Sequence, residues 1–273
     1  MRIEIIQADA LLWLETEVRE RPASFDCIIT DPPYWTLDKW RNVGTTTRLG
    51  GHRDATKQRD EMWFDTIDAD DLWEAFNNLG LLLKKNSHAY FFADCEVQAT
   101  LNNWVRESET PFNYVKNLVW DKEDAGMGYH WRARHEYVVM LEKGKRRLND
   151  LALPDVQRCK RVQGNHYPTE KPLALIETLL LNSTHEGERV LDPFCGSGVV
   201  GLACQKHGRD AVLIDKSDAA IAWTKRVLEG GPLLAAAKVQ EGPQCSQDAQ
   251  DCAGRTNGCE NDVRDHKCER SLK

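Results

Sequence analysis

Short apolar runs alternate with longer amphipathic stretches along most of the chain, a pattern typical of strands that alternate with helices. The apolar runs predict strands over residues 2–6, 25–30, 87–93, 115–121, 135–141, 188–192 and 211–215. The amphipathic stretches predict helices over residues 9–18, 69–84, 95–107, 171–183, 197–207 and 217–229. We therefore expect an α/β fold, in which a doubly wound and mostly parallel sheet carries helices on both faces.

Two long polar segments, residues 35–64 and 143–165, interrupt this alternation. Long irregular segments in compact domains usually serve a function or are disordered. From about residue 236 the chain becomes polar, contains glycine and cysteine, and lacks apolar periodicity. We therefore expect one domain over residues 1–235 and a disordered polar tail over residues 236–273.

The predicted strand 25–30 is followed directly by Asp31-Pro32-Pro33-Tyr34. Each proline fixes its φ angle and lacks a backbone N–H, so the turn is stiff and its carbonyls are free to accept hydrogen bonds. The Asp31 carboxylate and the Pro32 carbonyl are then available to a ligand amino group, while the Tyr34 ring offers a face for stacking. The same four residues are also compatible with a simple strand terminator.

A second candidate site follows the predicted strand 188–192, in the loop Asp192-Pro193-Phe194-Cys195-Gly196-Ser197-Gly198. Its glycines permit a ligand to approach the backbone closely. Asp215 ends the next strand, where an acid accepts hydrogen bonds from ribose in nucleotide-binding α/β folds. The loop lacks G-x-G-x-x-G and G-x-x-x-x-G-K-[ST], which disfavours dinucleotides and triphosphates and favours a neutral or cationic nucleoside.

The two motifs resemble those of DNA amino-methyltransferases, which methylate exocyclic amino groups of adenine or cytosine. Asp31-Pro32-Pro33-Tyr34 is similar to the catalytic motif of that family, and the loop from Asp192 to Gly198 is similar to its S-adenosylmethionine motif. The catalytic motif comes first along the chain, which is the order in the circularly permuted β class. Segments at 120–122, 132–137 and 166–172 fit as well, so the likeness runs from about residue 2 to about residue 230.

This resemblance implies a Rossmann-like class I methyltransferase fold, S-adenosyl-L-methionine as cofactor and double-stranded DNA as substrate. Asp31, Pro32, Pro33 and Tyr34 would act on a base that is flipped out of the duplex. By position, residues 35–64 resemble the DNA-clamping loop of the family and residues 143–165 its target-recognition region. Many members dimerise, so a homodimer is compatible with the resemblance.

The resemblance also implies a set of cofactor-binding residues: Asp9, Lys171, Asp192, Pro193, Phe194, Cys195, Gly196, Ser197, Gly198 and Asp215. For Asp9, which would approach the cofactor's adenine, a role as N-cap of the following helix is an equal alternative. The proposed chemistry requires no metal.

Several activities remain open at this point. Aspartate in the first motif position favours adenine N6, because cytosine-N4 enzymes of the family more often carry serine there. An RNA or protein amide methyltransferase is disfavoured by the permuted order of the motifs. A non-catalytic DNA-binding module is disfavoured by the intact cofactor loop, and a nucleotide-binding dehydrogenase by the missing glycine fingerprint.

Composition changes this picture only slightly. The formal net charge of −7 is unusual for a DNA-binding protein, but local charge matters more than the total, and basic residues cluster after the first motif and before the second. Any single lysine or arginine could also be an ordinary solvated side chain. We expect DNA contacts from Arg41, Arg48, Arg53, Lys57, Arg132, Arg134, Lys145 and Arg146.

The sequence has nine cysteines but no C-x-x-C pair, which disfavours a structural zinc site. Cys27 and Cys204 lie in apolar runs and are predicted to be core thiols, and Cys195 a small packing residue. No apolar stretch approaches the roughly 20 residues that a membrane span needs, and the N-terminus leads into a strand instead of a signal peptide. We therefore expect a cytoplasmic protein.

Overall fold

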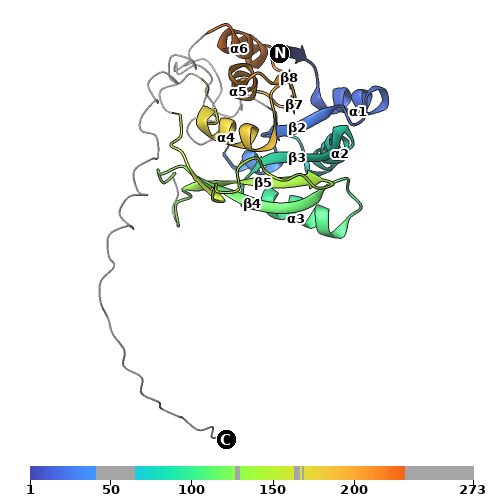
Figure 1. Ribbon diagram of the computed structural model, residues 1–273. Helices are drawn as coiled ribbons and strands as arrows, with labels where there is room; N and C mark the ends of the chain where they lie inside the picture. The colour runs from blue at the N-terminus through green and yellow to red at the C-terminus, as the bar shows by residue number, and fades with distance from the viewer. Residues whose placement is uncertain (41–64, 127–129, 163–166, 168, 231–273) are drawn as a thin grey trace, which may run out of the picture. The chain divides into compact units, whose positions relative to one another are not determined.

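The computed structural model describes residues 1–40, 65–126, 130–162, 167 and 169–230 (Figure 1). Within these residues the chain forms an eight-stranded sheet. Its strands, in spatial order, are β1 (Ile3–Gln7), β8 (Asp210–Asp215), β7 (Arg189–Asp192), β2 (Phe25–Thr30), β3 (Leu83–Ala93), β5 (His135–Lys143), β4 (Asn113–Asp121) and β6 (Val156–Arg158).

All strands but one run in the same direction. β5 pairs antiparallel with both β3 and β4, and every other neighbouring pair is parallel. The carboxyl ends of β1, β8, β7, β2, β3 and β4 therefore meet at one end of the sheet, and β5 begins there. This confirms the predicted mostly parallel sheet.

Helices cover both faces of the sheet, as expected (Figure 1). α1 (Ala10–Glu20), α2 (Ala69–Leu82) and α3 (Cys95–Glu107) share one apolar cluster with side chains of one sheet face. α4 (Leu173–Ser183), α5 (Val199–His207) and α6 (Asp218–Leu228) share a second cluster with the other face.

The central strand β2 shows why the sheet is buried on both faces. Ile28 packs into the cluster of α1, α2 and α3, and Ile29 into that of α4, α5 and α6; neither side chain is exposed. Successive side chains of a strand point to opposite faces, so a strand between two helical layers must be apolar throughout. Burying each such side chain contributes about 1.5–3 kcal/mol.

The structure differs from the predicted elements mainly at their ends. β3 begins at Leu83 and not at residue 87, and α2 ends at Leu82. α5 begins at Val199 and not at residue 197, because Gly198 has a left-handed φ of 78° and stands before the first helical residue. Two short elements lie in segments predicted to be irregular: a 3-10 helix, Trp35–Trp40, and β6.

Several predictions fall on residues that the structure does not describe. These are the predictions for most of the 35–64 segment, for residues 163–165 of the second long segment and for the tail. Among the described residues, no helix is both long enough and apolar enough to cross a membrane.

Candidate active site

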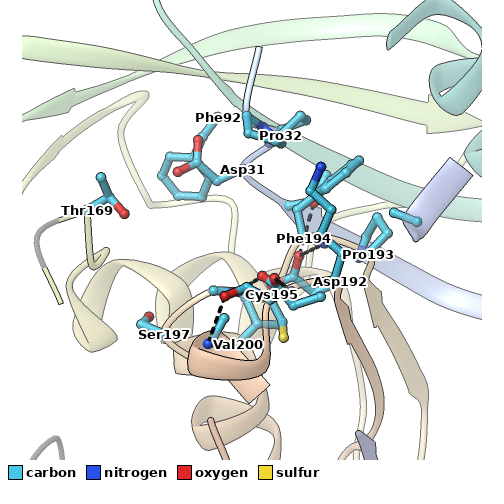
Figure 2. Close-up of a pocket in the computed structure, with 18 of the residues that line it drawn as sticks. Asp31, Pro32, Phe92, Thr169, Asp192, Pro193, Phe194, Cys195, Ser197 and Val200 are labelled. Carbon is cyan, nitrogen blue, oxygen red and sulfur yellow. Dashed lines mark hydrogen bonds between the residues drawn. The ribbon is translucent and has the colours of Figure 1, made fainter. Parts of the chain in front are cut away.

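A cavity of about 460 Å³ opens at the carboxyl ends of β1, β8, β7 and β2. Figure 2 shows Asp31 and Pro32 on one side of this cavity and the loop that carries Asp192, Phe194 and Cys195 on the other. The two motifs, whose aspartates Asp31 and Asp192 are 161 positions apart in the sequence, thus face the same space. Of the residues predicted from the sequence, the cavity is lined by Asp9, Asp31, Pro32, Pro33, Lys171, Asp192, Pro193, Phe194, Cys195, Gly196, Ser197 and Asp215.

A buried hydrogen bond joins the two motifs. The hydroxyl group of Thr30, the last residue of β2, donates to Asp192 Oδ1 over 3.0 Å. Both residues are almost fully buried, with 1% and 3% of their surface exposed. Because β2 and β7 are parallel neighbours, their last residues meet here. The bond therefore fixes Asp31 relative to the glycine loop, residues 192–198. Thr30 was not singled out from the sequence.

The Asp-Pro-Pro-Tyr turn is held by its own backbone and by the segment before α2. Tyr34 N–H donates to the Pro32 carbonyl over 3.0 Å, and Ile67 N–H donates to the Pro33 carbonyl over 2.7 Å. A carbonyl oxygen has two lone pairs, so Pro32 retains one for a ligand. The predicted acceptor therefore exists, but it already carries one hydrogen bond.

Tyr34 is placed differently from the other motif residues. Only 5% of its surface is exposed, and it packs with the apolar cluster of α1, α2 and α3. Burial, and then the nearby carboxylate of Asp31, raise the pKa of its hydroxyl well above its ordinary value. Tyr34 and Gly198 are the residues of the two motifs that do not line the cavity.

The Asp31 carboxylate is paired with Lys171, which lies just before α4. The Lys171 ammonium contacts Asp31 Oδ2 and lies 3.7 Å from Glu136 Oε2 and 5.1 Å from the centre of the Phe92 ring. Glu136, on β5, also pairs with Lys122, which follows β4. In the described part of the chain, no hydrogen bond reaches Asp31 Oδ1.

Burial and the neighbouring charges shift the pKa values of Asp31, Lys171 and Glu136 in opposite directions. Burial raises the pKa of Asp31, and Lys171 only partly offsets that rise. Burial alone would lower the pKa of Lys171, but Asp31 and Glu136 raise it above its ordinary value. Burial would likewise raise the pKa of Glu136, but Lys171 and Lys122 hold it below its ordinary value. The cavity thus has an ammonium between two carboxylates at one wall.

The glycine loop wraps around Asp215. Gly196 N–H donates to Asp215 Oδ2 over 3.0 Å, and Ser217 N–H donates to Oδ1 over 2.9 Å. Gly196 has a φ of +47°, and a Cβ atom there would lie 2.9 Å from the Tyr167 hydroxyl. A carboxylate oxygen accepts more than one hydrogen bond, so Asp215 can also accept from the hydroxyl groups of a ligand.

The capping role considered for Asp9 is confirmed, whereas its approach to the cofactor's adenine stays a prediction. Its Oδ1 accepts from Leu11 N–H over 3.0 Å and from Leu12 N–H over 3.3 Å, so it is the N-cap of α1. It also lines the cavity, beside the end of β1.

The cysteine predictions are confirmed as well, because Cys27, Cys195 and Cys204 are buried free thiols.

The predicted DNA-binding residues divide into three groups. Arg41, Arg48, Arg53 and Lys57 lie outside the described residues. Arg132 and Arg134 are exposed and precede β5, at the cavity end of the sheet; Arg134 pairs with Asp121.

Lys145 and Arg146 follow β5 and therefore lie at the opposite end of the sheet. Arg146 pairs there with Glu188 through two hydrogen bonds of 3.2 and 2.9 Å, and only 14% of its side chain is exposed. The structure therefore places these two predicted DNA-binding residues away from the cavity, because the length of β5 separates them from it. Of the later basic residues, Arg158 ends β6 at the cavity end of the sheet, and Lys160 and Arg161 follow it.

A cavity at the carboxyl ends of parallel strands, walled by an acid-proline turn and a glycine loop, defines a nucleotide-type site of an α/β enzyme. A model of the DNA methylase family matches residues 25–226 of the chain. The chain therefore belongs to the DNA methylase family, and the predicted DNA methyltransferase activity is confirmed.

Individual relatives agree with this assignment. The chain is 31% identical to the putative methylase YubD of Escherichia coli (strain K12), over 70% of this chain and 75% of the relative. It matches the crystal structure of an M1.HpyAVI–SAM complex with a TM-score of 0.62 and 22% identity, over 83% of this chain and 100% of that chain. It matches the cytosine-N4-specific PvuII DNA methyltransferase with a TM-score of 0.62 and 14% identity, over 85% and 94% of the two chains. The last two likenesses confirm the class I methyltransferase fold.

Proposed function

We propose that the chain transfers a methyl group from S-adenosyl-L-methionine to the exocyclic amino group of a base flipped out of double-stranded DNA, and that this base is adenine. The observation that carries the proposal is the cavity itself, which Asp31 and the glycine loop line together. The aspartate in the first motif position favours adenine N6 over cytosine N4, which is the alternative target.

The residues around the glycine loop fit the cofactor. Asp215 and Asp9 supply carboxylate oxygens for hydroxyl and amino groups, and Gly196 leaves space where any side chain would collide with Tyr167. When bound, S-adenosylmethionine supplies an electrophilic methyl group on a sulfonium centre. Lys171 was predicted to belong to this cofactor set, and its ammonium group pairs with Asp31.

The acid-proline turn, residues 31–34, offers hydrogen-bond acceptors to the amino group of the target base. Asp31 Oδ1 and the second lone pair of the Pro32 carbonyl are the acceptors available for its two N–H bonds. Positive charge builds on the nitrogen during methyl transfer, so a carboxylate beside it stabilises the transition state more than the ground state. Base flipping costs a few kcal/mol. Contact with the apolar surface of Pro33, Phe92 and Leu37 in the cavity offsets part of this cost.

The cavity end of the sheet also has the charge that DNA requires. Arg132, Arg134, Arg158, Lys160 and Arg161 are exposed there. Their position at the same end of the sheet as the cavity supports a contact with phosphates of the bound duplex.

The experiment is methyl transfer from tritiated S-adenosylmethionine to duplex DNA, followed by hydrolysis to nucleosides. We expect the label in N6-methyladenine; label in N4-methylcytosine would assign the alternative base, and no label in DNA would contradict the proposed function. Asp31→Ala should lower kcat by about 100-fold or more while cofactor binding, measured by calorimetry, is retained. Asp155→Asn, an exposed acid paired with Lys116, is the control and should behave as the wild type.

A further inference from the structure

Four side chains of alternating charge form a row from the cavity wall to the far side of β5. They are Asp31 after β2, Lys171 before α4, Glu136 on β5 and Lys122 after β4. The two lysines are well buried, with 12% and 15% of their side chains exposed. The row begins at a residue of the proposed chemistry, and the chemistry assigned so far gives Glu136 and Lys122 no role.

Lys171 is shared unequally between its two carboxylates. It contacts Asp31 directly, whereas its distance to Glu136 Oε2 is 3.7 Å. Glu136 is in turn shared, because its other oxygen, Oε1, pairs with Lys122. In a partly buried site such charges interact more strongly than in water, so a change at one end of the row alters the other end.

We propose that Glu136 is a positioning residue for methyl transfer: by competing for the Lys171 ammonium, it keeps that ammonium from fully neutralising the Asp31 carboxylate that receives the target amino group. Lys122 limits this competition by engaging Glu136 from the other side. The inference rests on the proposed function of Asp31 and extends it to two residues that do not touch the base.

The directions in which the charges shift the pKa of Asp31 agree with this arrangement. Burial raises that pKa, Lys171 lowers it, Glu136 raises it and Lys122 lowers it. Glu136 and Lys122 therefore act on Asp31 with opposite signs. Among the described residues, Asp31 also interacts with Asp192 at the end of β7, with Tyr34 in the motif itself and with Tyr167 before α4. Arg161, after β6, interacts with Glu136.

Two substitutions test the row because they should have opposite effects. Glu136→Gln keeps the side-chain shape but removes the competing charge, so Lys171 should neutralise Asp31 more fully. We expect kcat to fall about tenfold and the acid limb of kcat/KM to move to lower pH by roughly 0.5–1 unit. Lys122→Met removes the charge that restrains Glu136, so the acid limb should move to higher pH.

The matched control is Glu142→Gln, the same substitution on the same strand at its opposite end, which should leave the pH profile unchanged. An altered cofactor site would also lower kcat, so the cofactor affinity is measured as a second control. By calorimetry, Glu136→Gln should bind S-adenosylmethionine within about twofold of the wild-type affinity. A purely structural role for Glu136 would lower the melting temperature and leave the acid limb in place.

A second measurement does not depend on activity. The carboxyl ¹³C signals of the aspartates are followed during a pH titration, and the signal of Asp31 is assigned by its loss in Asp31→Asn. We expect the pKa of Asp31 to fall in Glu136→Gln and to rise in Lys122→Met. Equal values in both variants and the wild type would overturn the inference, whereas a wild-type protein that methylates no DNA would contradict the proposed function and leave the titration result valid.

Discussion

At the scale of single residues, Asp192 is an acid whose charge the fold disfavours. Only 3% of its surface is exposed, and its Oδ1 accepts both the Thr30 hydroxyl and Phe194 N–H. Burial raises its pKa to about 7, and the charges of Asp31 and Asp215 add to the rise. Between pH 4 and pH 7 the folded protein therefore holds a proton on Asp192 that the unfolded chain has released.

Asp192→Asn should reveal this difference. A folded-state pKa above the unfolded-state value contributes stability below the unfolded pKa, and that stability is lost as pH rises through about 7. Asn keeps an oxygen for both hydrogen bonds but cannot ionise. Urea unfolding should show similar free energies for the two proteins near pH 4 and a more stable variant near pH 7.5, by at most on the order of 4 kcal/mol. A difference that does not grow with pH would contradict the assignment.

At the scale of elements, the start of α1 combines a structural role with a role at the cavity. Asp9→Ala removes the N-cap and should lower the free energy of unfolding by about 1 kcal/mol. Asn caps helices as well as Asp does, so Asp9→Asn should keep the stability. If Asp9 also accepts the amino group of the cofactor's adenine, both variants should bind S-adenosylmethionine more weakly, with Ala losing about five- to tenfold.

The control for this prediction is Asp68, the N-cap of α2, which does not line the cavity. Asp68→Ala should lose a similar amount of stability, and both Asp68→Ala and Asp68→Asn should bind the cofactor as the wild type does. Calorimetry and thermal unfolding provide the two readouts. Unchanged cofactor affinity in Asp9→Ala would leave Asp9 with the capping role alone.

The elements that the sequence predicted well are those whose side-chain pattern is decided by burial on the sheet. The middle residues of β2 and β7 are apolar on both faces, so the positions of these strands follow from the sequence alone. β6 has only three residues and joins the edge of the sheet through backbone pairing with Val119, Trp120 and Asp121. Its side chains are mostly exposed, so no apolar pattern marks it in the sequence.

The candidate site was likewise only partly predictable from the sequence. Asp31 and Asp192 were predictable because each follows an apolar strand in a recognisable motif. The polar contacts around them were not, because Thr30, Glu136 and Lys122 come from three different strand ends that meet only in the folded sheet. The polar residue at the start of the apolar run 136–141 was the available signal for Glu136.

At the scale of the whole molecule, the net charge of −7 does not say at which end of the sheet individual basic residues lie. Arg132, Arg134 and Arg158 are exposed at the cavity end, whereas Lys145 is exposed at the other. The direction of β5 causes this difference, because residues before an antiparallel strand and residues after it lie at opposite ends. Basic residues that are close in the sequence therefore face different surroundings.

Arg158→Gln and Lys145→Gln compare the two ends directly. Arg158 lies at the far limit of ion pairing with Asp121, 4.0 Å away, so its removal should disturb the fold little. If the cavity end binds DNA, Arg158→Gln should weaken duplex binding and reduce the slope of log K against log salt by about 0.9, which corresponds to one phosphate contact. Lys145→Gln should change neither quantity, and fluorescence anisotropy between about 50 and 200 mM salt measures both. Equal losses in the two variants would show that DNA binding draws on the total charge of the protein and not on the surface beside the cavity.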